Sequence, residues 1–417
     1  MLISVLYFLK YSLILRWLIV IAILLLIDVI CWFPVKSLTK SLDISWKMNL
    51  KRFVWSLSII FYVLLAFFML FHQMRHTAAS YSAIYWLISF FIFWYLPRLI
   101  IFIFWLPEVL IFNFIKIFFR KAIKYFYPIT KTGLLLSCVL TIVLLSGTFY
   151  GRYRFRVINQ DINIKGLPAS FDGFKIAQVS DIHIGSFCFH KKKFAKAINL
   201  ITAQHPDIIF FTGDLVNYFS DEAIAFGDEF KKLKAPYGLY SIRGNHDYGA
   251  YIHWMNDSAR NADNAKILEF EKNVGFKFLS NEHVAIIKNN DSLFIAGVEN
   301  WGHPPFPQLG DVNKAISGIN HNQCIILLSH DPDYWDVEIK KIEAIKLTLS
   351  GHTHGMQIGL KWAGKEYSPA SLRFKQWGGL YEYNGRFLYV NRGLGSIGLP
   401  ARIGMRPEIT VITLHRI

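Results

Sequence analysis

Aspartate, histidine and asparagine recur in five short blocks in the second half of the chain. Their side chains offer carboxylate oxygen, amide oxygen and imidazole nitrogen, and the blocks contain no cysteine. This mixed oxygen and nitrogen set suits Mn, Fe or Zn and differs from the thiolate set of a structural zinc site. The chemistry that it predicts is metal-assisted. The candidate ligands are Asp181, His183, Asp214, Asn245, His330, His352 and His354.

One such block alone carries little weight, because two nearby histidines are commonly just surface residues. All five blocks, however, follow short apolar runs that are typical of β-strands. Residues at the carboxyl ends of strands in an α/β sheet converge on one crevice, so the blocks are expected to meet there. Glycines before Asp214, Asn245 and His352 allow sharp turns and close backbone approach.

The elements that must position these blocks are short strands alternating with helices, as in a layered α/β domain over residues 151–417. Helices are expected at about 191–204 and 221–233. The expected strand segments are 175–183, 206–215, 238–247, 292–298, 322–332, 344–354, 386–394 and 408–417.

Residues 1–150 have a different character. They hold 14 Lys and Arg against 3 Asp and Glu, whereas the whole chain is 53% hydrophobic and 16% aromatic. About 20 apolar residues are needed for one transmembrane helix. Four stretches satisfy this length and predict an all-α transmembrane region: roughly Leu13–Phe33, Phe53–Phe71, Tyr81–Trp105 and Gly133–Tyr150.

Polar residues at helical spacing near 107–126 predict an amphipathic helix in the membrane interface, with a fifth span as the alternative. The acid Asp28 within the first span suggests a helix-packing or interfacial residue more than an ion pathway. Basic residues cluster between the apolar stretches and form no dense run downstream, so no nucleic-acid partner is expected. The four cysteines contain no Cys-x-x-Cys pair, which indicates neither a disulfide framework nor a zinc knuckle.

The five blocks resemble the calcineurin-like metallophosphoesterase superfamily, whose pattern is D-x-H, G-D, G-N-H-D/E, a lone H and G-H-x-H. The resemblance covers residues 155–417 and is closest to the membrane-linked phosphodiesterase branch of the YkuE and YaeI type, through GHTHGMQ and NRGLGSIGLPARIGMRPEI. It implies an α/β/β/α sandwich of two mixed sheets. Met356 stands where this branch usually has glycine, which puts the local loop geometry in doubt.

The resemblance also implies roles for individual residues. Asp181, His183 and His354 would bind one divalent ion, Asn245, His330 and His352 a second, and Asp214 would bridge them. Manganese is the expected metal, with Fe, Zn or Mg as alternatives. Two cations about 3.5–4 Å apart can bind phosphate oxygens and lower the pKa of a bound water.

Outside the metal ligands, the resemblance makes His246 the catalytic phosphate contact and proton donor, with Asp247 orienting its ring. Weaker candidates for phosphate or supporting contacts are Arg243, Arg392, Asn217 and Glu299.

The expected function is therefore a membrane-anchored, dinuclear-metal phosphoesterase acting on a phosphomonoester, phosphodiester or pyrophosphate, of a lipid or nucleotide-linked lipid. The expected partners are the bilayer and this substrate. Aromatic and basic residues in 248–255, 301–307 and 361–377 favour contact with the headgroup region. The distribution of positive charge favours an integral plasma-membrane protein with an extracytoplasmic catalytic domain. The alternatives are a catalytically silent membrane sensor, a transporter with an accessory phosphatase domain, or a nuclease or protein phosphatase.

Overall fold

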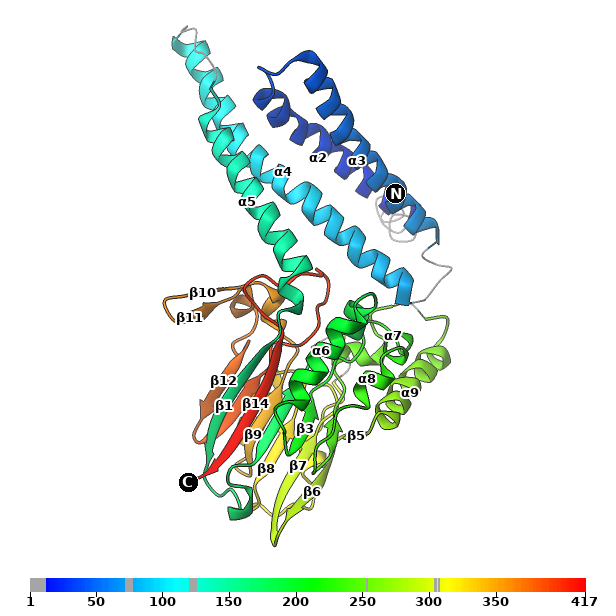
Figure 1. The fold of residues 1–417 in the computed structure, drawn as a ribbon, viewed down its shortest axis with the longest axis vertical. Helices are drawn as coiled ribbons and strands as arrows, with labels where there is room; N and C mark the ends of the chain where they lie inside the picture. Colours follow the sequence, from blue (N-terminus) through cyan, green and yellow to red (C-terminus); the bar gives the residue numbers. More distant parts are fainter. Residues whose placement is uncertain (1–12, 72–77, 120–125, 253, 304–305, 307) are drawn as a thin grey trace, which may run out of the picture. The chain divides into compact units, whose positions relative to one another are not determined.

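The chain divides into two compact units (Figure 1). The computed structural model describes residues 13–71, 78–119, 126–252, 254–303, 306 and 308–417. One unit is helical and ends at Leu145, and the other runs from Ser146 to Ile417 and also takes in residues 77–82.

The helical unit consists of α2 (Leu13–Leu38), α3 (Ile44–Phe71), α4 (Ala78–Phe119) and α5 (Pro128–Phe149). All four are long and apolar enough to cross a membrane. They coincide with the four predicted stretches, although α3 begins earlier than Phe53 and α5 earlier than Gly133.

The segment predicted as a separate amphipathic helix near 107–126 is, as far as Phe119, the last part of α4. Residues 120–125 lie outside the described residues. Pro97 and Pro107 both lie inside α4 and do not end it. In an apolar environment a helix is favoured even across proline, because it keeps most backbone groups hydrogen-bonded. The described helices contain four candidate membrane spans and no separate fifth one.

Polar side chains tie the four helices together. Asp28 on α2 is buried and accepts hydrogen bonds from Arg98 of α4 at 2.5 Å and Tyr95 of α4 at 3.1 Å, and also from Tyr62 of α3. On α4, Glu108 accepts from the backbone N–H of Thr130 at 2.8 Å and so caps the start of α5. A buried acid paired in this way holds helices in register, which agrees with the packing role expected for Asp28.

The second unit is built on two six-stranded sheets. In sheet order, the strands of the first are β1 (Arg156–Ile164), β14 (Glu408–Arg416), β2 (Lys175–Val179), β3 (Ile208–Phe211), β4 (Leu239–Ser241) and β5 (Phe276–Phe278); those of the second are β12 (Gly379–Tyr383), β13 (Arg386–Val390), β9 (Ile345–Ser350), β8 (Ile325–Leu328), β7 (Asp291–Gly297) and β6 (Glu282–Lys288). Within the first sheet, β2, β3, β4 and β5 are parallel, whereas β14 runs antiparallel to β2; within the second, β7, β8, β9 and β13 are parallel, and β6 and β12 are antiparallel edge strands. Both sheets are therefore mixed, as the resemblance implied.

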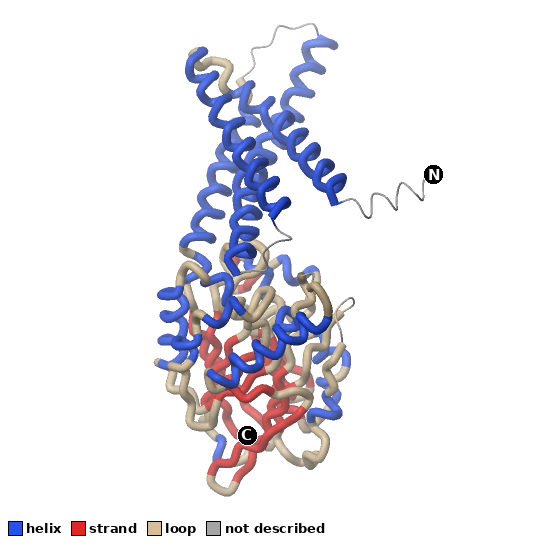
Figure 2. The backbone as a smooth tube through the Cα atoms, turned by 90° about the vertical axis from the view of Figure 1, so that its right-hand side faces the viewer, coloured by secondary structure: helices blue, strands red, loops and turns tan. Residues whose placement is uncertain are grey.

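Alternation along the buried strands builds the layers. On β3, Ile208 and Phe210 face the core between the sheets, and Ile209 and Phe211 face the helices. Strands therefore lie inside the unit and helices outside (Figure 2), which confirms the expected α/β/β/α sandwich. The outer helices are α6 (Lys191–Thr202), α7 (Asp221–Ile224), α8 (Gly227–Phe230) and α9 (Asp257–Asn273) beside the first sheet, and α10 (Val312–Ala315) and α11 (Asp333–Val337) beside the second.

The helix predicted at 191–204 is α6, but the one predicted at 221–233 is wrong as a single element. The structure divides it into α7 and α8, with the break just before Gly227. Glycine lowers helix stability by about 1 kcal/mol relative to alanine, and Phe226 and Phe230 are buried on the core side of the break.

The carboxyl group of Glu271 on α9 is fully buried and accepts a hydrogen bond from the hydroxyl of Ser241 at 2.6 Å. Burial raises the pKa of Glu271 from 4.5 to about 8 and outweighs the hydrogen bond. The pKa of Glu271 is higher in the folded state than in the unfolded state. The contribution of this group to the free energy of unfolding is therefore fully present below pH 4.5 and is lost as pH rises through about 8.

We therefore expect Glu271→Gln to remove a pH-dependent loss of stability on the order of 4 kcal/mol between pH 4.5 and about 8. The measurement is the thermal midpoint of the detergent-solubilised protein across pH 4.5 to about 8. Glu269→Gln, at an exposed position of the same helix, is the matched control and should keep the wild-type pH profile. An unchanged profile for Glu271→Gln would show that another group carries the dependence.

Candidate metal centre

The seven candidate ligands follow the carboxyl ends of five strands from both sheets. Asp181 and His183 follow β2, Asp214 follows β3, and Asn245 follows β4. His330 follows β8, and His352 and His354 follow β9. Within each sheet these strands are parallel, so their carboxyl ends lie at one edge. The loops of the two sheets meet at these edges.

Asp181, His183, Asp214 and His354 form the first cluster, and their potential ligand atoms all lie within 4.8 Å of one another. The Nε2 atom of His354 lies 3.2 Å from Oδ1 of Asp181 and 3.0 Å from Nε2 of His183. All four side chains are buried. At 3.0 Å the nitrogens of His183 and His354 can share either one proton or one cation.

Asp214 also belongs to the second cluster, with His330 and His352. One oxygen, Oδ2, lies 3.5 Å from Nε2 of His183 and 3.3 Å from Nε2 of His330. The Oδ1 atom of Asn245 lies 3.1 Å from Nε2 of His330 and 2.8 Å from Nδ1 of His352. A single carboxylate oxygen thus stands between two groups of donors.

Backbone carbonyls orient two of the rings. Nδ1 of His183 faces the carbonyl of Val216 at 3.1 Å, and Nδ1 of His330 faces that of Thr212 at 2.7 Å. A ring that donates from Nδ1 presents the lone pair of Nε2, which is the usual outer support of a metal-binding histidine. The donor set, its spacing and its orientation fit a pair of divalent ions.

The loops that carry the ligands are strained. Asp181, His183, Asp214, His352 and His354 all have φ between 40° and 71°. Such left-handed backbone costs a non-glycine residue roughly 1–2 kcal/mol. A Cβ atom on Gly244 would overlap the carboxylate of Asp214, and one on Gly351 would overlap that of Asp181. The glycines next to the blocks therefore leave room for the carboxylates.

Met356 also lies in the left-handed region, with φ of 46°, directly after Gly355 with φ of 53°. The loop thus has the backbone that glycine adopts easily, although methionine occupies the position. Met356 therefore adopts a backbone conformation that is unfavourable for methionine.

His246 lies beside the first cluster, with its ring 4.8 Å from that of His183 and perpendicular to it. Its Nδ1 faces the backbone carbonyl of Asn217 at 2.7 Å, and its backbone N–H donates to Oδ1 of Asp214 at 2.8 Å. Asn217, a weaker sequence candidate, therefore contributes through its carbonyl.

The expected role of Asp247 in orienting the His246 ring is corrected by this geometry. The Asp247 carboxylate accepts hydrogen bonds from the backbone N–H groups of four residues: Asp214 at 2.8 Å, Gly244 at 3.0 Å, Leu215 at 2.8 Å and Val216 at 3.3 Å. A carboxylate facing turn N–H groups fixes the loop. Asp247 is thus a positioning residue for the backbone on which Asp214 stands.

The two arginines predicted as weak substrate contacts are engaged elsewhere. Arg392 donates to Glu366 at 2.5 Å and to Glu408 at 2.7 Å and is buried. A phosphate would have to displace one of these carboxylates, so we leave Arg392 out of the proposed substrate contacts. Arg243 lies over the rings of Tyr248 and Phe278, at 5.2 and 5.3 Å. The remaining weak candidate, Glu299, accepts from Ser280 at 2.6 Å and from Tyr248.

Two residues near the centre were missed by sequence reasoning. The ring of Tyr251 stacks on His246 with centroids 4.0 Å apart, and its hydroxyl accepts from the amide of Asn245. Arg402 is fully buried, and its Nη2 lies 3.3 Å from Nδ1 of His354. Tyr251 lies in the aromatic segment 248–255, and Arg402 lies in the C-terminal pattern NRGLGSIGLPARIGMRPEI. Both segments were singled out in the sequence for other reasons.

Electrostatics in the cluster favour negative carboxylates. Burial would raise the pKa of Asp214, but His330, His246 and His183 hold it well below its usual range. For His330, burial would lower the pKa, but the Asp214 carboxylate outweighs it and raises the pKa to about 10. Without a metal, His330 would therefore carry a proton that metal binding must displace, whereas burial lowers the pKa of His183 and His352 and leaves these rings neutral.

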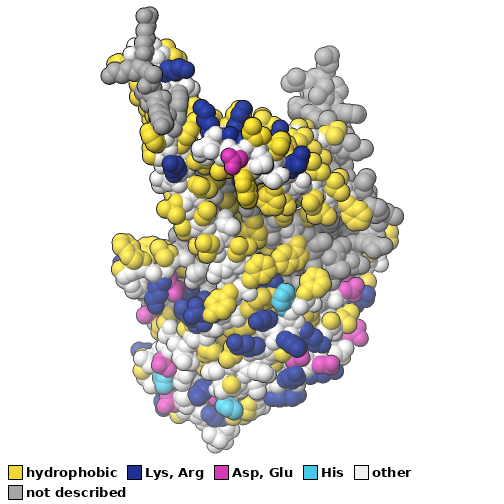
Figure 3. Space-filling view, turned by 45° about the horizontal axis from the view of Figure 1, so that its top comes forward, with side chains coloured by type: hydrophobic (Ala, Val, Ile, Leu, Met, Phe, Trp, Pro, Cys, Tyr) yellow, Lys and Arg dark blue, Asp and Glu magenta, His cyan; other side chains and the backbone are white. Residues whose placement is uncertain are grey.

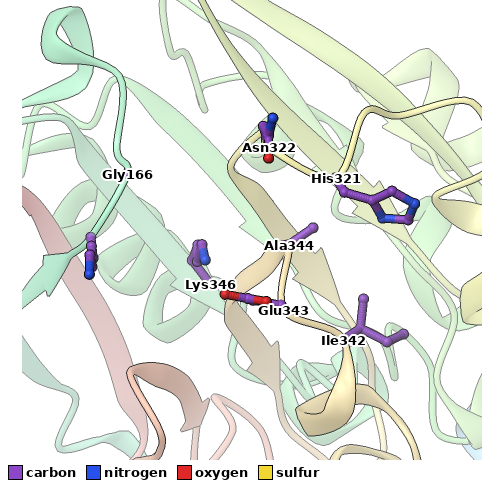
Figure 4. Close-up of a pocket in the computed structure, with 8 residues that line it drawn as sticks. Gly166, His321, Asn322, Ile342, Glu343, Ala344 and Lys346 are labelled. Atoms are coloured by element: carbon purple, nitrogen blue, oxygen red, sulfur yellow. The ribbon is translucent and has the colours of Figure 1, made fainter.

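A separate pocket of about 450 Å³ is lined by polar residues such as Lys165, His321 and Lys346 (Figure 4). It lies next to the amino ends of β8 and β9. The metal candidates follow the carboxyl ends of the same strands. This pocket is therefore distinct from the metal centre.

Comparison with known proteins identifies the family. The profile described as "Calcineurin-like phosphoesterase" matches residues 174–356. The chain is 33% identical over 255 residues to "Uncharacterized metallophosphoesterase YkuE" of Bacillus subtilis, covering 60% of this chain and 81% of that protein. The chain belongs to the calcineurin-like phosphoesterase family. It is thus a metal-dependent phosphoric ester hydrolase, as the sequence predicted.

Two further relatives are named as a transmembrane protein and as a pyrophosphatase. A zebrafish "Transmembrane protein with metallophosphoesterase domain" is 28% identical over 271 residues, which span 63% of this chain and 57% of that protein. "UDP-2,3-diacylglucosamine pyrophosphatase LpxG" of Chlamydia trachomatis is 29% identical over 293 residues, spanning 58% of this chain and 83% of that protein. Together with the four apolar helices, the transmembrane relative supports membrane association.

Because Asp214 belongs to both ligand clusters, its substitution tests whether it bridges two metal ions. Asp214→Asn preserves shape but removes the charge that would offset two cations, so bound metal should fall below two per chain. Hydrolysis of bis(p-nitrophenyl) phosphate should fall by about 10²–10³-fold or more. Elemental analysis and steady-state rates give the two readouts.

Asp228→Asn, an exposed substitution of the same kind, should leave metal content and rate unchanged. An active Asp214→Asn protein with two tightly held ions would rule out the bridging role.

Proposed function

We propose that the chain is a membrane-anchored, dinuclear-metal phosphoesterase whose substrate is a lipid or nucleotide-linked lipid phosphoester. The observation that carries the dinuclear site is the single Oδ2 atom of Asp214, within 3.5 Å of histidine nitrogens from both clusters. Asp181, His183 and His354 would hold one ion, and Asn245, His330 and His352 the other. Manganese remains the expected metal, with Fe, Zn or Mg as alternatives that the same sulfur-free set of oxygen and imidazole donors also suits.

When bound, the two ions would supply Lewis-acid activation of the phosphate and of a water nucleophile. The protein residues supply the geometry for this reaction. The Asp214 carboxylate offsets charge between the two sites, and Asp247 fixes its loop through four backbone N–H groups. The carbonyls of Val216 and Thr212 keep the Nε2 atoms of His183 and His330 directed into the site.

His246 is the proposed proton donor to the leaving oxygen. The Asn217 carbonyl at Nδ1 and the stacked ring of Tyr251 hold the imidazole, which leaves Nε2 as the nitrogen for substrate. A general acid placed in this way typically contributes about 10²–10⁴-fold.

A lipid substrate is supported by three observations. Four helices are suited to a bilayer, the protein named LpxG is a pyrophosphatase of a diacylated sugar nucleotide, and exposed aromatic and basic side chains lie in 361–377. Of the other two aromatic segments, residues 253, 304–305 and 307 lie outside the described residues. A silent sensor would be expected to have lost ligands, whereas all seven are present.

The proton-donor role predicts a dependence on the leaving group. His246→Asn should retain both metals and lose about 10²-fold or more on alkyl phosphoesters, whose alkoxide needs a proton. It should lose much less on p-nitrophenyl esters, whose phenolate leaves without one. The readout is the ratio of kcat/KM for the two substrate types. His205→Asn, at an exposed position, should match the wild type; equal losses on both substrates would exclude proton donation by His246.

The proposed localisation places the catalytic unit outside the cytoplasm. With four spans, the connecting segments 34–52 and 106–132 carry five Lys and Arg each, against six on the opposite side: Lys10, Arg16, Arg75, Arg152, Arg154 and Arg156. Lys10, Arg75, Arg120, Lys121 and Lys124 among these lie outside the described residues. By the positive-inside rule, a reporter fused after Ile417 should be active only if it functions outside the cytoplasm. Activity of a strictly cytoplasmic reporter would reverse the assignment.

A further inference from the structure

A small hairpin leaves the metal-binding loop and carries an apolar face. Its strands are β10 (Leu360–Trp362) and β11 (Lys365–Tyr367), joined by Ala363 and Gly364, which both have positive φ. That is the backbone of a tight two-residue hairpin turn. The hairpin projects from the second unit (Figure 1) and forms a two-stranded sheet of its own.

The pairing register separates its two faces. Leu360 lies opposite Tyr367, and Trp362 opposite Lys365, so these four side chains share one face. Lys361 and Glu366 share the other. Glu366 is paired with Arg392 at 2.5 Å and Arg156 at 3.4 Å, which fixes its face toward the domain. The face with Leu360 and Trp362 is therefore the outward one.

The outward face is largely apolar and exposed. Leu360 is 63% exposed and Trp362 70% exposed, and Leu372 in the following short helix is 90% exposed. That helix packs beside the metal-binding loop, since Ser368 donates to the carbonyl of Gly355 at 2.6 Å. Lys365 on this face, and Arg373 and Lys375 beyond it, are also exposed. Figure 3 shows hydrophobic side chains on the projecting hairpin with basic ones beside them.

Backbone hydrogen bonds connect the hairpin to the end of the last candidate span. Gly147, in the last turn of α5, belongs to the same unit as the hairpin, and its carbonyl accepts from the N–H of Arg402 at 3.2 Å. The next residue, Ile403, donates to Gln357 and accepts from Gly359, each at 2.8 Å. Leu360 follows immediately. If α5 crosses the bilayer, the base of the hairpin lies where the chain leaves it.

The same connection reaches the metal centre. The side chain of Arg402 lies 3.3 Å from Nδ1 of His354, and Phe374, beyond the hairpin, lies edge-on to His352 at 5.6 Å. The end of the span, the hairpin and two candidate metal ligands are thus joined through a few residues of one unit.

We infer that the β10–β11 hairpin and Leu372 form a membrane-docking surface that enters the headgroup region of an anionic phospholipid bilayer. Leu360, Trp362, Tyr367 and Leu372 would enter the interface, where aromatic rings are favoured, while the neighbouring lysines contact anionic headgroups. The docked hairpin presents the metal centre to phosphoesters held in the bilayer. This presentation rests on the proposed phosphoesterase function, whereas the docking itself does not.

Photo-crosslinking tests docking without any need for activity. The full-length protein carries p-benzoylphenylalanine at position 362, or at Ile287 as the control, and is placed in vesicles of phosphatidylglycerol and phosphatidylcholine. Ile287 is also exposed but lies on β6, at the opposite edge of the second sheet from β12. Irradiation should give phospholipid adducts at position 362, detected by mass spectrometry, and few at 287. No adduct at 362, or equal yields at both positions, would overturn the docking surface.

A kinetic comparison tests substrate presentation. The substrates are methyl p-nitrophenyl phosphate in solution and hexadecyl p-nitrophenyl phosphate in the same vesicles, which share one scissile bond. The double variant Leu360→Ser with Trp362→Ser should keep its rate on the methyl ester and lose about tenfold on the hexadecyl ester, since it lacks two apolar side chains for the interface. The control Ile287→Ser with Ile417→Ser should lose neither activity.

The two arms separate the possible failures. Equal rates for wild type and the Leu360/Trp362 variant on the hexadecyl ester would overturn presentation by the hairpin. A wild-type protein that is loaded with metal yet hydrolyses neither ester would contradict the proposed function, while adducts at 362 would still support docking.

Discussion

The carboxylate of Asp214 is the contact on which the rest of the catalytic unit depends. Its Oδ1 accepts the backbone N–H of His246, and its Oδ2 lies between the nitrogens of His183 and His330. His183 comes from a loop of the first sheet and His330 from a loop of the second. One small anionic group thus joins the two sheets at their loop edge. The buried charge requires nearby cations or hydrogen-bond donors, which is why imidazole side chains and backbone amides surround it.

The strained loops are stable because rigid elements and hydrogen bonds hold them. Five of the ligands adopt left-handed backbone, a cost that recurs at functional sites. The four backbone N–H groups that meet Asp247, and the fully buried strands β3 and β8, keep these loops in place. The ligand atoms can therefore be positioned before any ion arrives, which lowers the ordering cost of metal binding.

Arg402 connects the last turn of α5 to the metal centre. Its backbone meets Gly147 in the last turn of α5, and its buried guanidinium donates to the carbonyls of Gly395 and Arg392 beside His354. An arginine with fixed acceptors is a rigid connector, since its planar fork allows few alternatives. In the helical unit, the Asp28–Arg98 pair has an equivalent role in tying α2 to α4.

The sequence by itself determined the local features: four apolar helices, the strands that end in Asp and His, and the family to which the chain belongs. These follow from hydrophobic periodicity and short motifs, which neighbouring residues set. It did not determine partners that are distant in the chain. Asp247 was assigned to the adjacent His246, but it meets Leu215 and Val216; Arg392 was assigned to substrate, but it meets Glu366 and Glu408. The break before Gly227 and the stacking of Tyr251 on His246 were likewise set by packing. Only the tertiary structure decides such contacts, because a polar side chain takes whichever partner the packed core brings within hydrogen-bond distance.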